Sequence, residues 1–238
     1  MAEWNDRTEL LIGSDNMALL ASKHVLVVGV GGVGAYAVET LVRAGIGHIT
    51  IIDADEVSVT NLNRQLPALV STVGESKVEV MKRRALDINP DIDITAISTF
   101  ISEENIPEIL NQGFDFVVDA IDSVAPKVAL IKHCLIHKIK IISSMGAGGR
   151  IDPTKITYAN IWDTYNDGLA KVVRTRLKAM NMHHKLNVVW SSEAPRASSL
   201  TETSEMQNKR TSYGTIVYLP AIFGCMAGAF VIRKLTGL

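Results

Sequence analysis

The sequence predicts an α/β fold with a mostly parallel sheet, and three features predict it. A glycine-rich β-α-β unit occupies residues 23–53, a second strand with acidic residues at its carboxyl end occupies residues 114–122, and apolar runs alternate with helical periods as far as residue 149. Strands separated by helices pair in parallel, and such sheets bind ligands where their strands end. We therefore expect a single domain over residues 1–238 with its site at that edge.

The composition fits this expectation. The chain is 47% hydrophobic and 21% charged with a formal net charge of −1, so any contact with a polyanion requires a local patch. Cys134 and Cys225 are too few for a disulfide framework or a four-cysteine zinc site, and we expect both to be small core residues. No basic and then apolar leader opens the chain, so we expect a cytoplasmic protein.

The first β-α-β unit predicts a nucleotide site. An apolar strand over residues 24–28 reaches the sequence GVGGVG, a helix continues to Ala44, and a second strand over residues 49–52 ends at Asp53. Glycines permit a tight turn and let backbone approach phosphate, the helix start offers free N–H groups, and the acid would take a ribose hydroxyl. NAD and ATP both remain open at this point. The glycines concerned are Gly29, Gly31, Gly32 and Gly34.

The remaining elements follow from apolar runs and helical periodicity. Residues 1–22 are predicted to form an amphipathic packing arm, with Ser14 or Asp15 capping a helix. Further elements are expected as helices over 75–88, 103–112, 126–137 and 168–182 and strands over 92–97, 114–118, 139–143, 155–162 and 186–190. Residues 191–213 have no clear period and are predicted to be a flexible crossover loop.

The C-terminal region has an unusual apolar stretch. Residues 215–232 carry no charge, which is near the lower limit for a membrane span. Gly224 and Gly228 form a small-residue pair four apart, which suits close helix packing inside a protein as well as in lipid. We favour a buried C-terminal helix or a dimer contact, with membrane association as the alternative.

The sequence TNLNRQ, residues 60–65, carries the strongest chemical signal. Arg64 presents a planar fork of donors, Lys77 adds a point charge, and Asn61 can bind phosphate or ribose. A dehydrogenase has no obvious use for this cluster directly after its ribose acid. A nucleotidyl-transfer site does have a use for such a cluster, because negative charge develops on the α-phosphate during the reaction. A solvated surface loop is the alternative.

Two acidic residues follow the strand over 114–118. Asp122 at a strand end beside a triphosphate can hold Mg²⁺, which takes one or two protein carboxylates together with phosphate oxygens. Alternatively, Asp122 or Ser123 caps the next helix. Asp119 is predicted to support the turn.

Taken together, GVGGVG, Asp53, TNLNRQ, Lys77 and DAIDS resemble the adenylating domain of ubiquitin-activating-type enzymes, the ThiF and MoeB superfamily. RTELLIG, DAIDSVAPKVALI and GAGGRIDPTKI are similar to its branch of tRNA threonylcarbamoyladenosine dehydratases. The resemblance implies a Rossmann-like fold and an enzyme that uses ATP and Mg²⁺ to adenylate the threonyl carboxylate of the modified adenosine in tRNA. Cyclisation with loss of water would follow. It also implies a homodimer, and sulfur-transfer accessory proteins stay open as partners.

The resemblance also assigns roles to residues. Arg64, Lys77 and Asp122 would be catalytic, with Asp122 as the magnesium ligand, and Arg7 would reach into the partner subunit's ATP site. The ATP-binding set would be Gly29, Gly31, Gly32, Gly34, Asp53, Asp55, Asn61, Arg64, Gln65, Lys77, Asp122 and Ser123.

A tRNA substrate predicts a local basic surface, with a solvated helix face as the alternative. The expected contacts are Lys171, Arg174, Arg176, Lys178 and Lys185, with His183, His184, Lys209 and Arg210 adding positive charge nearby.

Three rival functions stay open. The first is adenylation of the C-terminal glycine of a ubiquitin-like sulfur carrier, although the chain has no CxxC pair and residues 191–213 contain no cysteine for a thioester. The second is an NAD-dependent oxidoreductase, which leaves Arg64, Lys77 and Asp122 unexplained. The third is a non-catalytic nucleotide-binding scaffold.

Overall fold

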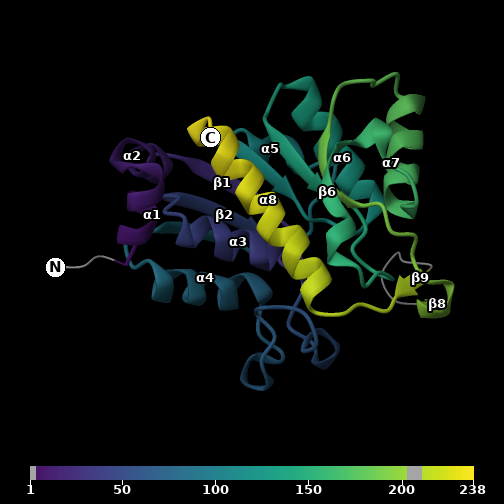
Figure 1. Cartoon of the computed structure of the whole chain (residues 1–238), viewed down its shortest axis with the longest axis horizontal. Helices are drawn as coiled ribbons and strands as arrows, with labels where there is room; N and C mark the ends of the chain where they lie inside the picture. Colours follow the sequence, from purple (N-terminus) through teal and green to yellow (C-terminus); the bar gives the residue numbers. More distant parts are fainter. Residues whose placement is uncertain (1–3, 203–210) are drawn as a thin grey trace.

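A seven-stranded sheet forms the centre of the computed structural model, which describes residues 4–202 and 211–238 (Figure 1). The strand order is β3-β2-β1-β4-β5-β7-β6, with β6 antiparallel to β7 and the other neighbours parallel. This arrangement confirms the predicted mostly parallel α/β fold. The strands are β1 His24–Val28, β2 His48–Ile52, β3 Asp93–Ile97, β4 Phe116–Asp119, β5 Ile141–Ser144, β6 Ile156–Asn160 and β7 Asn187–Ser191.

Helices cover both faces of the sheet. On one face, α2, α3, α4 and α8 pack against Val25 and Val27 of β1, and on the other α5, α6 and α7 pack around Leu26 and Val28. Successive side chains of a strand point to opposite faces, which is why β1 is apolar throughout. The helices are α1 Asp6–Ile12, α2 Ser14–Ala21, α3 Gly34–Arg43, α4 Lys77–Ile88, α5 Ile106–Leu110, α6 Val124–Ile136, α7 Gly168–Ala179 and α8 Tyr218–Thr236.

Two details of the predicted elements are wrong. The N-terminal arm is two helices separated by Gly13, whose φ of 84° favours glycine, and neither Ser14 nor Asp15 caps α2. The helix expected over 103–112 is the shorter α5. Asn105 shortens it, because its side chain accepts from the Ser102 N–H and donates to the Phe100 carbonyl, which holds the preceding residues in a turn.

The apolar C-terminal stretch forms α8, which packs along α3. A Cβ added at Gly224 would lie 2.2 Å from the Val33 carbonyl oxygen, and one added at Gly228 would lie 2.8 Å from Thr40 side-chain carbons. The glycine pair therefore serves close packing between two helices of the domain. Cys134 is buried as predicted, but the prediction that Cys225 is a core residue is wrong: Cys225 is exposed, because α8 turns Gly224 and Gly228 toward the domain. Within residues 4–202 and 211–238, α8 is the helix long and apolar enough to cross a membrane by length and composition, and 39% of its apolar window is buried in the domain.

The predicted crossover loop, residues 191–213, is described in part. Its described portion contains a two-stranded hairpin of β8, Leu200–Glu202, and β9, Thr211–Tyr213. Strands of three residues carry too little alternation to be recognised in a sequence. Residues 203–210, with Lys209 and Arg210, lie outside the described residues.

Candidate active site

The glycine loop after β1 is held tightly against the turn after β4. Gly29 has a φ of 87°, and a Cβ added to it would lie 2.8 Å from the Ala120 carbonyl oxygen. A Cβ at Gly34 would lie 1.7 Å from the Gly29 carbonyl oxygen. Side chains are thus excluded where the loop turns into α3, and backbone N–H groups at the helix start are left facing the edge of the sheet.

Asp53, at the end of β2, fixes the same loop. Its carboxylate accepts from the Val30 N–H at 2.6 Å and from the Asp55 N–H at 2.8 Å. Burial raises the pKa of Asp53 above its ordinary value, while nearby Lys77 and the two backbone donors act in the opposite direction. The predicted ribose acid therefore lies beside the glycine loop.

Arg64 lies over the glycine loop. Its guanidinium donates to the Thr60 carbonyl at 2.8 Å and to the Asn63 side-chain oxygen at 2.7 Å, which fixes its direction. Its Cγ is 3.6 Å from the position that a Cβ of Gly32 would take. Burial lowers the pKa of Arg64, and the carboxylate of Asp122 opposes this effect. An arginine and a carboxylate from different loops thus share one electrostatic environment.

Gln65, which follows Arg64 in the sequence, also lies close to the glycine loop. Its side-chain nitrogen is 3.6 Å from the position of an added Gly31 Cβ. Its Oε1 atom is buried and has no hydrogen-bond partner among the described residues. An unsatisfied buried acceptor is costly, so this oxygen fits an N–H or O–H group of a bound ligand.

Lys77 and Asn61 are both engaged within the protein. Lys77, the first residue of α4, is 4% exposed and its ammonium contacts the Asp55 carboxylate at 2.7 Å. Asn61 accepts from the Ser58 N–H at 3.1 Å, so its oxygen holds the short 59–61 turn and its amide nitrogen is the group left to donate. Lys77 also lies near Asp53, whose carboxylate holds the glycine loop through the Val30 N–H.

The turn after β4 is built on a buried ion pair. Asp119, Lys127 and Ser143 are all fully buried. One oxygen of Asp119 contacts the Lys127 ammonium at 2.7 Å and the Ser143 hydroxyl at 2.5 Å, and its other oxygen accepts from the Ile121 N–H at 3.1 Å. The prediction that Asp119 supports the turn is confirmed. Lys127 and Ser143 were missed, and a single lysine inside the apolar run VAPKVALI was the signal for the pair.

Asp122 and Ser123 lie at the exposed end of this turn. The Ser123 hydroxyl is 3.4 Å from Asp122, and although Ser123 occupies the N-cap position of α6, its side chain makes no capping hydrogen bond. The carboxylate of Asp122 is exposed. No group of three metal-ligating side chains occurs within the described ranges, so a magnesium ion here would take Asp122 together with phosphate oxygens and water.

Arg7 lies at the other end of the domain. Within one chain, α1 and α2 lie beside the C-terminal end of α8, whereas Pro220 near the N-terminal end of α8 is 3.2 Å from an added Gly32 Cβ (Figure 1). Arg7 is exposed on the same face of α1 as Leu10 and Leu11, which are 87% and 84% exposed. The structure therefore does not bring Arg7 to the glycine loop of its own chain.

The predicted basic residues divide into two groups. Arg174 donates to Thr164 and to the Ile161 carbonyl, so it is engaged inside the fold. The Lys178 ammonium lies 6.0 Å from the Trp162 ring centroid, over the ring. The exposed members of the set are Lys171, Arg176, Lys178 and Lys185.

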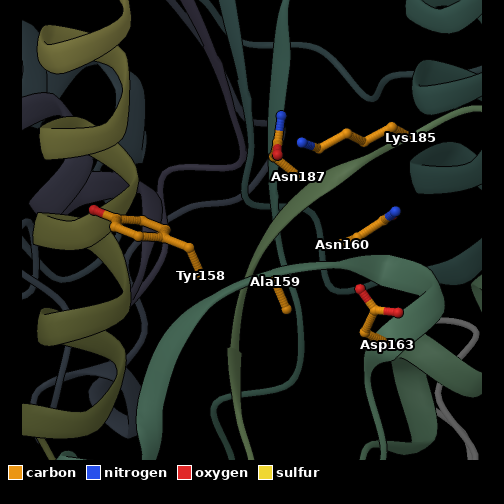
Figure 2. Close-up of a pocket in the computed structure, with 6 residues that line it drawn as sticks. All are labelled: Tyr158, Ala159, Asn160, Asp163, Lys185 and Asn187. Atoms are coloured by element: carbon orange, nitrogen blue, oxygen red, sulfur yellow. The ribbon is translucent and has the colours of Figure 1, made fainter.

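Lys185 lines an open pocket of about 400 Å³, together with residues of β6, the first residue of β7 and Asp163 (Figure 2). Asn160 and Asn187 are paired in the register of the two strands, and the ammonium of Lys185 extends toward Asn187. Asn187 begins β7, so this pocket lies at the opposite edge of the sheet from the glycine loop. This pocket is thus separate from the nucleotide-type loops.

Comparison with known proteins gives a consistent result. The model of the ThiF family matches residues 6–238. The tRNA threonylcarbamoyladenosine dehydratase of Bacillus subtilis is 39% identical over 236 residues, which cover 96% of this chain and 93% of that protein. The Haemophilus influenzae dehydratase is 42% identical, covering 93% and 88%. The crystal structure of Escherichia coli tRNA N6-threonylcarbamoyladenosine dehydratase, TcdA, in complex with ATP superposes with a TM-score of 0.89 at 38% identity, covering 98% and 95%.

A sulfur-carrier branch of the same superfamily matches less of the chain. The molybdopterin-synthase adenylyltransferase of Escherichia coli is 34% identical over 154 residues, which cover 65% of this chain and 59% of that protein. The similarity to the dehydratases extends over nearly the full length of both partners, including the region after β5. The chain therefore belongs to the ThiF family, in its branch of tRNA threonylcarbamoyladenosine dehydratases.

Proposed function

We propose that this chain is an enzyme that uses ATP to adenylate the threonyl carboxylate of threonylcarbamoyladenosine in tRNA and then cyclises that side chain with net loss of water. The observation that carries the proposal is the position of Arg64 over the glycine loop, within electrostatic reach of Asp122, in a chain that matches the dehydratases over nearly its whole length. The family match alone would support nucleotide binding. The cation and the carboxylate at this position support chemistry on a phosphate.

The proposed reaction has two steps. An oxygen of the threonyl carboxylate attacks the α-phosphorus of ATP, pyrophosphate leaves, and an acyl-adenylate forms. A neighbouring atom of the same side chain then attacks the acyl carbon, and AMP leaves with the former carboxylate oxygen. Because the attacking atom is already held close, ring closure requires no enzyme nucleophile. In agreement with this, Cys134 is buried and burial raises its pKa to about 12, which keeps the thiol protonated.

Each site residue has a role in the first step. The glycine loop and the start of α3 would hold the phosphates through backbone N–H groups, and Asp53 would accept from a ribose hydroxyl. Arg64 would stabilise charge that develops on the α-phosphate, and Lys77, once drawn from Asp55, would add a second positive charge. Gln65 Oε1, buried and unpartnered, would accept a hydrogen bond from the nucleotide. Mg²⁺ held by Asp122 would neutralise charge on the phosphates.

The role of Asp122 is tested by Asp122→Asn. Loss of one charged oxygen ligand, on the order of 1.5 kcal/mol, is expected to raise the magnesium concentration for half-maximal AMP formation by about tenfold. Asp91→Asn, an exposed residue outside the site, is the matched control and should leave that concentration unchanged. An identical magnesium dependence for Asp122→Asn and the wild type would show that Asp122 is not a ligand.

We infer that two copies of the chain form the active enzyme, with Arg7 completing the partner's ATP site. Arg7, Leu10 and Leu11 share one exposed face of a seven-residue helix, which fits burial against a second copy. Arg7→Ala and Arg64→Ala are each expected to be nearly inactive, whereas subunit exchange between them should restore about a quarter of the wild-type rate, because half of the dimers would regain one intact site. If exchanged dimers stay inactive, Arg7 does not act across the interface.

The proposal also includes contact of tRNA with the exposed lysines and arginine of α7 and with Lys185, and it implies a cytoplasmic enzyme. Phosphate contacts of this kind would make the affinity for tRNA depend on salt. Sulfur-transfer accessory proteins are not needed for the reaction as written.

The test of the proposed function uses purified protein, ATP, Mg²⁺ and tRNA that carries threonylcarbamoyladenosine. The tRNA is digested and its nucleosides are analysed by mass spectrometry. Loss of one water from the modified adenosine, together with AMP release, is expected. An unchanged mass, combined with exchange of pyrophosphate that depends on a ubiquitin-like carrier, would establish the sulfur-carrier rival.

A further inference from the structure

A small pocket lies beside the proposed phosphate site and is used by none of the steps above. We call it the 149–216 pocket; its volume is about 160 Å³. Three backbone hydrogen bonds of 2.8 Å hold its walls together: Gly149 N–H to the Gly214 carbonyl, Arg196 N–H to the Gly149 carbonyl, and Gly214 N–H to the Ser199 carbonyl. The walls of the pocket therefore consist of residues that the structure describes. The lining residues are Gly149, Arg150, Ile151, Arg196, Ser199, Gly214, Thr215 and Ile216.

The pocket adjoins the segment that carries Arg64. The side chain of Asn63 donates to the Thr215 carbonyl at 3.0 Å, so one wall of the pocket is hydrogen-bonded to the residue that also fixes the Arg64 guanidinium. The opposite wall follows β5, whose carboxyl end lies on the same edge of the sheet as the glycine loop. A group bound in the pocket would thus lie next to the segment that carries Arg64, on the same edge of the sheet as the glycine loop.

The two arginines of the pocket differ in the hydrogen bonds and ion pairs that their guanidinium groups form. Arg150 is 3% exposed, and its guanidinium is used up by the Asp167 carboxylate and by backbone carbonyls that include those of Glu193 and Asn166. Arg196 is exposed, and no described residue forms an ion pair or hydrogen bond with its guanidinium. The nearby Glu193 carboxylate accepts from the backbone at 151 and 152. Among the residues that the structure describes, the positive charge of Arg196 is therefore uncompensated.

An aromatic ring adjoins this charge. Tyr213 is 41% exposed, and its side chain packs so closely on the loop that a Cβ added to Gly148 or Gly149 would lie 2.9 Å from it. Only glycine leaves room for the ring at these two positions. A partly exposed ring beside an arginine that no described residue pairs with suits an unstacked nucleotide, because the base can stack on the ring and the backbone phosphate can contact the cation.

We propose that the 149–216 pocket is a substrate subsite that holds part of the modified nucleotide, with Arg196 binding an oxyanion of the RNA. This inference rests on the proposed function. The oxyanion has two possible sources in one substrate, namely the phosphodiester next to the modified nucleoside and the threonyl carboxylate itself. The same guanidinium chemistry serves both.

The test compares Arg196→Ala, Arg196→Lys and the control Lys140→Ala, an exposed cation that precedes β5 at the opposite edge of the sheet. Dissociation constants are measured for an anticodon stem-loop that carries the modification and for the free modified nucleoside, which has no phosphate. For Arg196→Ala we expect the dissociation constant for RNA to rise about tenfold and the slope of its logarithm against the logarithm of salt concentration to fall by about 0.7. Arg196→Lys should keep the slope, and Lys140→Ala should behave as the wild type.

Comparison of the stem-loop with the free nucleoside distinguishes the two possible sources of the oxyanion. Weaker binding of the stem-loop with unchanged binding of the nucleoside assigns Arg196 to the phosphodiester, and equal weakening of both assigns it to the threonyl carboxylate. Unchanged binding of both ligands would overturn the subsite. Because binding is measured without turnover, a wild-type enzyme that binds the stem-loop but fails to cyclise it would contradict the proposed function and leave this test intact. ATP affinity is measured in parallel and should be unchanged.

Discussion

Arg64→Ala is expected to lower the rate of adenylation by about 100-fold to 1,000-fold while weakening ATP binding only a few-fold. The guanidinium is fixed by Thr60 and Asn63 before any ligand binds, so its donors are already directed when charge develops on the α-phosphate. Preorganised donors of this kind act most strongly in the transition state. Single-turnover AMP formation measures the rate, and calorimetry with a non-hydrolysable ATP analogue measures binding.

Two further variants sharpen this prediction. Arg64→Lys keeps the charge but loses the planar fork, so it should recover only part of the lost rate. Arg83→Ala removes an exposed arginine of α4 that pairs with Glu75, and it should leave both quantities unchanged. If Arg64→Ala reduced the rate and the affinity for ATP by the same factor, Arg64 would be a ground-state binding residue.

Lys127→Met is expected to lower the free energy of unfolding by about 3–5 kcal/mol. Lys127 and Asp119 are fully buried at 2.7 Å, and removal of one partner leaves an uncompensated charge in the interior. The loss is measured by urea denaturation followed by circular dichroism. Because Asp119 holds the turn that carries Asp122, the variant should also need more Mg²⁺ at temperatures where it is folded.

The matched control is Lys132→Met on the same helix. Lys132 pairs with Glu103 at 2.8 Å, but both side chains are exposed, so the expected change is within about 0.5 kcal/mol. The double variant Lys127→Met with Asp119→Leu removes both charges and should recover part of the stability. A loss below about 1 kcal/mol for Lys127→Met alone would show that the ion pair contributes little to the fold.

The sequence predicted the sheet because its strands are separated by strongly periodic helices. It also predicted which loops meet, since parallel strands bring their carboxyl ends to one edge, and the structure places Asp53, Arg64 and Asp122 there. The nucleotide remained open between NAD and ATP on the glycines alone. The residues after Asp53 and the family resemblance decided that question.

Contacts between distant segments could not be predicted in the same way. The hydrogen bond of Ser143 to Asp119 joins two different strands, and the hydrogen bond of Asn63 to Thr215 joins segments 152 residues apart. Neither has a periodic signature. The capping prediction for α2 was wrong because the N-cap position is Gly13, which has no side chain that could accept a hydrogen bond. Local pattern thus predicts elements, whereas tertiary contacts complete the site.

The central claim is that the substrate carboxylate becomes bonded to the α-phosphorus of ATP. We would label both oxygens of the threonyl carboxylate of the modified tRNA with ¹⁸O, allow one turnover with unlabelled ATP, and analyse the released AMP by mass spectrometry. The account predicts one ¹⁸O atom in the phosphate of each AMP and one in the cyclised nucleoside. AMP without ¹⁸O, formed while the tRNA is cyclised, would contradict carboxylate adenylation.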